Sequence, residues 1–254
     1  MTPATYVVRV WIPDRPGALG QVASRIGAAR GDVAGIEILE RGGGRAIDEI
    51  VVELPSADLL DTLIRQINEV EGVDVEDVRA VEGGHIDPWL DALDTASQLV
   101  GAGSAEELLE ALADHAYRGI GATWVAVAAL DGAGVHASRG PVPTDGWLHA
   151  FLEGSRHSAR NAEPATLRDV CWSPLPAAGV ALILGRDRTA FRAKERHQVA
   201  ALARIADAWL CGLQTISRLS CRLAHPSMTP SSLSPRPVAP RSTVSTAPPL
   251  DART

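Results

Sequence analysis

The chain has 254 residues, of which 46% are hydrophobic and 22% are charged, and its formal net charge is −7. This length is enough for one large or two small domains with substantial cores. The acidic balance argues against a nucleic-acid partner, which needs clustered lysine and arginine. The sequence has no run of 18 apolar residues to span a membrane and no signal-peptide pattern, so we expect a cytoplasmic protein without membrane contact.

Residues 1–81 combine strand and helix patterns in one α+β unit. Apolar residues alternate in the predicted strands and recur at three- and four-residue spacing in the predicted helices. The expected elements are a strand at 6–12, a helix at 19–26, strands at 36–40 and 47–54, a helix at 59–67 and a strand at 73–81. This βαββαβ order predicts a ferredoxin-like fold, in which a four-stranded antiparallel sheet carries both helices on one face.

Alternation along these strands assigns each residue to one face of the sheet. The helix-covered face is expected to hold Val8, Val10, Ile36, Ile38, Ile50, Val52 and Leu54. The opposite face would carry Arg9, Trp11, Leu39, Arg41, Glu49 and Val51. Because Trp11 and Leu39 should not be left in water, we expect a second subunit or the second domain to cover part of this face.

A glycine-containing segment at 82–86 predicts a linker, and residues 87–217 predict a second α+β unit. Its expected elements are helices at 88–100, 104–116, 144–155 and 192–217, and strands at 124–130, 135–138, 170–174 and 180–184. Ser104 and Glu107 have the spacing of a capping box. Residues 218–254 are dominated by Pro, Ser and Thr, so we expect them to form a disordered tail.

The segment Ile12-Pro13-Asp14-Arg15-Pro16-Gly17-Ala18-Leu19 ends the first strand and opens the first helix. With the βαββαβ order and the strand at 35–39, this D-R-P-G-x-L pattern resembles an ACT domain. The alanine- and arginine-rich composition is typical of a high-GC, actinobacterial type. The resemblance implies a regulatory module that binds a small molecule, usually an amino acid, commonly at an interface between two copies.

The second unit resembles a GAF domain. The residues that carry this likeness are Trp172-Ser173-Pro174-Leu175-Pro176, the strand at 179–184, and Phe191 followed by Glu195 before a closing amphipathic helix. The resemblance implies a unit that binds a small ligand or mediates dimers. The middle of this copy is short, which argues against a ligand pocket.

The turn before the first helix has the chemistry to bind an α-amino acid. Gly17 lets the backbone approach a ligand, and the helix start offers free N–H groups and a dipole that favour a carboxylate. The carboxylate of Asp14 could pair with a ligand ammonium. Without a ligand, Asp14 would instead cap the helix and Pro16 would occupy its first turn.

The ACT resemblance adds a second segment, in which Gly31 also fits a helix stop. The expected ligand-binding residues are therefore Asp14, Arg15, Pro16, Gly17, Ala18, Leu19, Gly31, Asp32 and Val33.

Other motifs favour structural roles. Gly42-Gly43-Gly44 predicts a hairpin, and Gly101-Ala102-Gly103 predicts a helix stop rather than a nucleotide site. The histidines and the three cysteines show no metal-ligand spacing, and the cysteines fit reduced thiols, so we expect no cofactor, metal or catalytic site. Asp114 and His115 diverge on their helix and do not form a catalytic pair. One shared aromatic core or a pocket for a planar ligand would explain Trp124, Trp147, Trp172 and Trp209.

These observations predict a non-catalytic regulatory protein. It would sense an amino acid, form a homodimer and act by population shift on a partner enzyme or signalling protein. The main alternative is a regulatory subunit of an amino-acid biosynthetic enzyme. A hydrolase or transferase built on the second unit is a third hypothesis.

Overall fold

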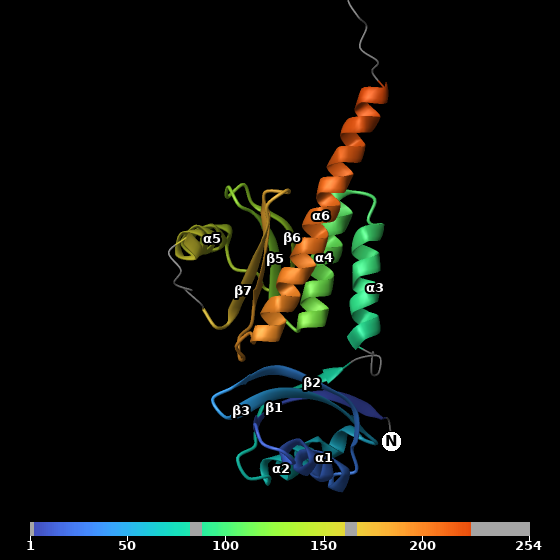
Figure 1. Ribbon diagram of the computed structural model, residues 1–254, viewed down its shortest axis with the longest axis vertical. Coiled ribbons are helices and arrows are strands. Elements are labelled where there is room, and N and C mark those ends of the chain that lie inside the picture. The colour runs from blue at the N-terminus through green and yellow to red at the C-terminus, as the bar shows by residue number, and fades with distance from the viewer. Residues whose placement is uncertain (1–2, 82–87, 161–166, 225–254) are drawn as a thin grey trace, which may run out of the picture.

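Alternating apolar residues place the N-terminal chain in a four-stranded antiparallel sheet with strand order β2-β3-β1-β4 (Figure 1). The computed structural model describes residues 3–81, 88–160 and 167–224. The elements of this first unit are β1 (Ala4–Pro13), α1 (Ala18–Ala28), β2 (Asp32–Gly42), β3 (Arg45–Leu54), a 3-10 turn (Ala57–Leu59), α2 (Leu60–Asn68) and β4 (Asp74–Val81). The βαββαβ order and the ferredoxin-like fold are confirmed.

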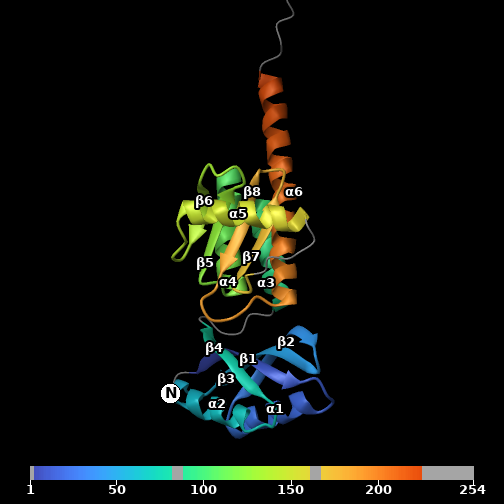
Figure 2. The ribbon, with the colours of Figure 1, turned by 90° about the vertical axis from the view of Figure 1, so that its left-hand side faces the viewer.

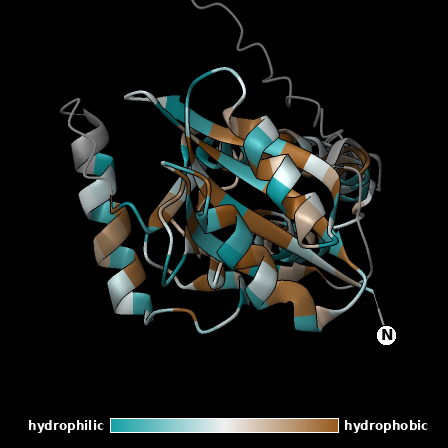
Figure 3. Cartoon of the chain, turned by 90° about the horizontal axis from the view of Figure 1, so that it is seen from below, coloured by the Kyte–Doolittle hydropathy of each residue, from teal (hydrophilic) through white to brown (hydrophobic). Residues whose placement is uncertain are grey.

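Helices α1 and α2 cover one face of this sheet and enclose its core (Figures 1 and 2). Figure 3 looks onto this helical layer and shows hydrophobic segments on both the helices and the strands behind them. Burying this apolar surface is the main force that stabilises the unit. The core contains the predicted Val8, Val10, Ile50, Val52 and Leu54, together with Val22, Ile26, Leu63 and Ile67 of the helices.

One prediction for the edge strand β2 is wrong, and two are confirmed only in part. Ile36 and Ile38 lie opposite Ile50 and Asp48 on the helix-covered face, as predicted, but 45% and 38% of their surfaces are exposed. The edge strand lies at the margin of the helical layer, which packs mainly on the central strands. The register also shifts between Ile38 and Glu40, so Arg41 pairs with Ala46 and lies on the helix-covered face instead of the opposite one.

The second unit is a four-stranded antiparallel sheet of order β6-β5-β8-β7 between helices. Its elements are α3 (Pro88–Gly101), α4 (Ala105–Ile120), β5 (Trp124–Ala129), β6 (Val135–Arg139), α5 (Asp145–Arg160), β7 (Val170–Leu175), β8 (Val180–Gly185) and α6 (Ala193–Ala224). Ser104 caps α4 by accepting a hydrogen bond from the N–H of Glu107, as predicted. Helix α6 continues to Ala224, beyond the predicted end at 217.

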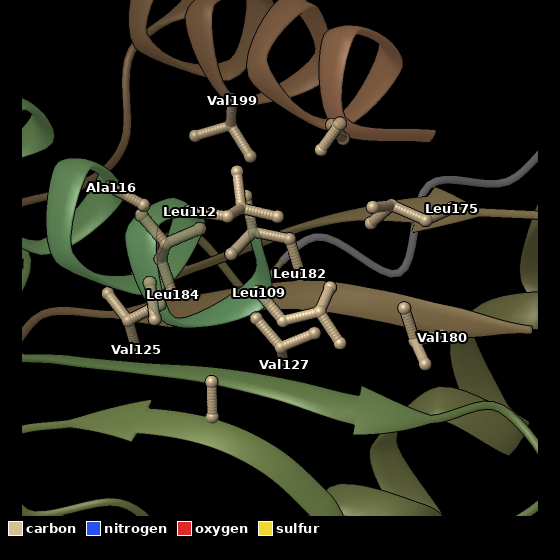
Figure 4. Close-up of a cluster of buried hydrophobic side chains, with 14 of the residues drawn as sticks. Leu109, Leu112, Ala116, Val125, Val127, Leu175, Val180, Leu182, Leu184 and Val199 are labelled. Carbon is tan, nitrogen blue, oxygen red and sulfur yellow. The ribbon is translucent and has the colours of Figure 1, made fainter. Parts of the chain in front are cut away.

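Two cores lie on opposite faces of the second sheet. Helices α4 and α6 cover one face, where leucines of α4 meet valines of β5 and Val199 of α6 (Figure 4), and α3 packs against these two helices. Helix α5 covers the other face through Leu148 and Leu152.

No helix of the described residues is long and apolar enough to span a bilayer. The predicted linker at 82–86 and the predicted tail from residue 225 onward lie outside the described residues.

Candidate ligand-binding site

The loop between β1 and α1 leaves the start of α1 open. Gly17 is the N-cap residue in a left-handed conformation (φ 86°), and no side chain caps the helix. The alternative in which Asp14 caps α1 and Pro16 lies in its first turn is therefore wrong. The N–H of Asp14 instead donates to the carbonyl oxygen of Gly44 at 2.9 Å, which fixes the loop against the β2–β3 hairpin.

Free backbone donors at this helix start suit an anion. Asp14, Arg15, Pro16 and Gly17 are exposed. The N–H of Ala18 makes a long 3.3 Å hydrogen bond to the Arg15 carbonyl. Within the described part of the chain, the N–H groups of Gly17 and Leu19 have no such partner. Such a start attracts a carboxylate through its N–H groups and the helix dipole.

The second predicted segment, residues 31–33, lies at the other end of the sheet. Asp32 begins β2 opposite Glu53, whereas Pro13 pairs with Arg45 at the far end of β3. About ten residues of strand, roughly 30 Å, separate these two ends. One chain therefore does not bring residues 14–19 and 31–33 together.

Helix α1 ends in a Schellman motif whose left-handed position is occupied by Arg30 (φ 65°) and not by the predicted stop residue Gly31. The N–H of Gly31 donates to the carbonyl of Ile26, and that of Arg30 donates to the carbonyl of Gly27. Gly31 has a different role, because a Cβ atom there would lie 3.0 Å from the side chains of Ile26 and Val52. Its missing side chain permits this close packing.

We expect Arg30→Gly to stabilise the protein by about 1 kcal/mol, because glycine adopts the left-handed conformation without strain. We expect Gly31→Ala, the neighbouring control, to destabilise it by about 1–2 kcal/mol through overpacking. Urea unfolding followed by circular dichroism measures both. Effects of the same sign would contradict this assignment.

An acid that the sequence analysis missed lies near the open helix start. Asp48 of β3 pairs with Val10 and Ile38, on the helix-covered face of the sheet. It exposes 4% of its surface, and its Oδ1 atom has no hydrogen-bond partner. Burial raises the pKa of Asp48 above its ordinary value, Arg41 opposes this shift and Asp14 adds to it. Asp48 has the same strand parity as Ile50 and Val52, so the pattern already indicated its burial.

The opposite face of the first sheet is covered by the N-terminal end of α6. A buried ion network joins the two units: Nη2 of Arg9 lies 2.6 Å from Oε1 of Glu49 and 2.8 Å from Oε1 of Glu195. The same Glu195 oxygen lies 2.5 Å from Arg186, and Arg79 contacts Glu49 at 3.2 Å. These five residues are called the interface network below.

Polar and aromatic contacts surround this network. Arg192 pairs with Glu76 and lies over the ring of Trp11, whose Nε1 also donates to Glu76 at 3.2 Å. Lys194 pairs with Glu37 at 2.7 Å. Leu39 keeps only 3% of its surface exposed. The prediction that a second domain or subunit covers Trp11 and Leu39 is confirmed, with the second unit as the cover.

The Phe191–Glu195 spacing has a structural role here. Oε2 of Glu195 accepts a hydrogen bond from the N–H of Arg192 at 2.7 Å and so caps α6. Burial raises the pKa of Glu195, but hydrogen bonding to Arg186 and the charges of Arg186 and Arg9 outweigh this and lower it. The guanidinium of Arg186 also lies over the ring of Phe191 at 4.3 Å. These residues therefore connect α6 to the first sheet.

The tryptophans of the second unit form neither one shared core nor an evident pocket. Trp124 contacts Trp147 edge to face, and Trp147 stacks on Phe151 of α5. Trp209 lies on the other side of the sheet, where its Nε1 donates to the Ala102 carbonyl at 3.0 Å.

His115 contacts Thr95 and Gln98 and not Asp114, which binds Arg139 and Arg118. Among the described residues, no cluster of His, Cys, Asp or Glu could hold a metal ion.

We expect Cys171 to be unreactive in the folded protein. It is buried in the core beneath α6, and burial raises the pKa of its thiol to about 11. Because the thiolate is the nucleophile, alkylation at neutral pH should be very slow. In a Cys211→Ser/Cys221→Ser variant, an aromatic disulfide reagent should label nothing until urea is added. Rapid labelling of this folded variant would contradict the prediction, and a Cys171→Ser/Cys221→Ser variant, which keeps the exposed Cys211, is the positive control.

The fold is that of a two-unit α+β protein whose first unit is ferredoxin-like. Residues 6–72 match the family model of the ACT domain. ACT domains are small-molecule-binding regulatory domains. This match covers the β1–α1 loop, the start of β2 and Asp48. No curated protein matches the chain.

Solved structures match different shares of the chain. The ACT domain from GTP pyrophosphokinase of Chlorobium tepidum is 20% identical, with 32% of this chain and 97% of that chain covered and a TM-score of 0.25. A putative glycine cleavage system transcriptional repressor is 10% identical, with 82% and 94% covered and a TM-score of 0.30. A bacteriophytochrome from R. palustris is 14% identical, with 70% and 48% covered and a TM-score of 0.36.

Proposed function

We propose that this protein is a non-catalytic, cytoplasmic regulatory protein that binds an α-amino acid through its ACT unit. The observation that carries this proposal is the open N-terminus of α1, within the segment that matches the ACT domain. Its free N–H groups suit the carboxylate of the ligand. The ligand-binding residues are those predicted from the sequence, at 14–19 and 31–33.

The ligand would lie between two copies of the chain. Residues 14–19 and 31–33 lie at opposite ends of one sheet, with the edge strand β2 between them. If β2 pairs with β2 of a second copy in antiparallel orientation, residues 31–33 of one copy meet residues 14–19 of the other. The exposed Ile36 and Ile38 on this strand support such a contact, because large apolar side chains on an edge strand favour association. A homodimer then contains the complete site.

The second unit would receive the effect of the ligand. The interface network fixes the start of α6 to β1 and β3, the two central strands of the ACT sheet. A ligand that favours one arrangement of two ACT sheets would therefore also favour one arrangement of two α6 helices. The GAF resemblance, which implies a dimerising unit, agrees with this role.

The alternative is a regulatory subunit of an amino-acid biosynthetic enzyme. The outer face of α3 favours a protein contact, because Leu90, Leu93 and Val100 are exposed on it. Light scattering of the purified chain separates the two functions. A stable homodimer supports the sensor, and a monomer that co-purifies with an enzyme activity supports the subunit.

A thermal-shift panel tests the proposed function. The full chain would be heated with each of the twenty amino acids at millimolar concentration. A ligand at about 100 times its Kd adds roughly 2.7 kcal/mol of stability, which moves the Tm by several degrees. We expect at least one amino acid to raise the Tm, and no effect from any of them would overturn the proposal.

Two glycine variants locate the site. Gly17→Val forces a β-branched residue into a left-handed conformation at the open helix start. Gly20→Val, one turn further along α1, has normal backbone geometry and equally open surroundings. The amino acid should still stabilise Gly20→Val but no longer stabilise Gly17→Val. Equal stabilisation of both would place the ligand elsewhere.

A further inference from the structure

The buried acid Asp48 lies on the helix-covered face of the first sheet and interacts electrostatically with Asp14 of the β1–α1 loop. Ala18, the first residue of α1, packs in the same core cluster as Val10, which is the strand partner of Asp48. Asp14 and Arg41 both lie close enough to affect its charge state. The side chain therefore belongs to the same end of the sheet, and the same side of it, as the free N–H groups of Gly17 and Leu19.

Burial disfavours the charged form of this acid, whereas the nearby charge of Arg41 favours it. Its Oδ1 atom is buried without a hydrogen-bond partner. Within the described residues, Arg41 acts on it through its charge alone and makes no hydrogen bond to it. An isolated buried carboxylate is destabilising unless a cation or a hydrogen-bond donor reaches it. The unpaired oxygen thus marks a position that a ligand donor would fill.

An apolar surface borders the same position. Ile38 lies directly beside Asp48 across the β2–β3 ladder, and Ile36 lies two residues further along the same face. Both side chains are more than one-third exposed. A ligand group that contacts them is stabilised by burying apolar surface.

We propose that Asp48 accepts the ammonium group of an α-amino acid with an apolar side chain. The N-terminus of α1 binds its carboxylate, and Ile36 and Ile38 contact its side chain. This inference rests on the proposed function and narrows its ligand class. It also replaces Asp14 as the ammonium acceptor, because Asp14 is exposed and an exposed ion pair contributes little to binding. A buried charge-assisted hydrogen bond contributes more.

Calorimetric titration of the full chain tests this proposal. The probes are L-leucine and L-phenylalanine, and for each the 2-hydroxy acid that replaces the ammonium with a hydroxyl. We expect at least one of the two amino acids to bind the parent protein, at least tenfold more tightly than its hydroxy acid. In Asp48→Asn this preference should disappear, and the amino acid should bind about 10- to 100-fold more weakly. The comparison of amino and hydroxy acids on the parent protein needs no variant, so it is independent of folding defects.

Other outcomes separate this proposal from the proposed function. Equal affinity of the amino acid for the parent and Asp48→Asn overturns the role of Asp48 but leaves the sensor function intact. A larger loss of affinity in Asp14→Asn than in Asp48→Asn also overturns the role of Asp48 and leaves the sensor function intact. It indicates that Asp14 accepts the ammonium group. Binding of L-aspartate or L-lysine in preference to both probes overturns the apolar ligand class. If no amino acid binds the parent protein, the proposed function itself fails.

Discussion

Arg9→Met is expected to destabilise the protein by about 3–5 kcal/mol, because it removes the central cation of a buried ion network. Nη2 of Arg9 contacts carboxylate oxygens of both Glu49 and Glu195. Without it, two buried carboxylates lose a shared partner, which weakens the contact between the first sheet and α6. Urea unfolding at pH 7, followed by tryptophan fluorescence, measures the change in the free energy of unfolding.

A surface pair provides the matched control. Arg25 and Glu69 lie 3.0 Å apart, and both side chains are 44% exposed. Arg25→Met should change the stability by no more than about 0.5 kcal/mol, because water screens this pair. Similar effects of Arg9→Met and Arg25→Met would mean that the interface network does not hold the two units together.

Asp48→Val is expected to stabilise the ligand-free protein by roughly 2 kcal/mol at pH 7. The substitution removes a buried carboxylate with an unpaired oxygen and places a β-branched residue beside Val10 and Ile38 in a central strand. The same variant should lose amino-acid binding. A gain in stability with a loss of binding is typical of a residue kept for function.

The pH dependence of this gain has a definite sign. Burial raises the pKa of Asp48 above its ordinary value of 3.8, so the folded protein binds the proton more tightly than the unfolded chain. The contribution of Asp48 to stability is therefore present below pH 3.8 and is lost as the pH rises through the raised pKa. The advantage of Asp48→Val over the parent should be small near pH 4 and grow toward pH 7. An advantage that shrinks with rising pH would contradict this account.

The sequence predicted the order of the elements because each carries a clear period. The strands of the first sheet largely alternate, β5 and β8 of the second sheet are short continuous apolar runs, and α4 begins at a capping box that pairs as expected. The bulge in β2 falls where two adjacent apolar residues, Ile38 and Leu39, interrupt the alternation, and the sequence prediction carried a regular alternation through this point. This shift moved Arg41 to the other face. The exposure of Ile36 and Ile38 depends on how far the helices reach over the sheet, which is a tertiary property.

The local geometry of the candidate site was predicted in part. The D-R-P-G-x-L pattern located the loop, but the sequence could not show whether Asp14 or Gly17 ends up at the N-cap. The contact of Arg9 with Glu195 spans 186 positions, and two separately patterned units must fold before these residues meet. Asp48 was the clearest missed signal, since a single acid at an inward position of a strand should prompt a search for its partner.

Residues 14–19 and 31–33 lie at opposite ends of the same sheet, and this placement affects how the protein would measure its ligand. Under the proposed function, a site made from both segments would exist only in pairs, so two equivalent ligands would bind each dimer. Ligand uptake and subunit association would then be one linked equilibrium. Dilution of the protein would weaken its apparent affinity for the amino acid, and an excess of the amino acid would lower the protein concentration needed for assembly. The response would therefore depend on the abundance of the chain as much as on the supply of the metabolite.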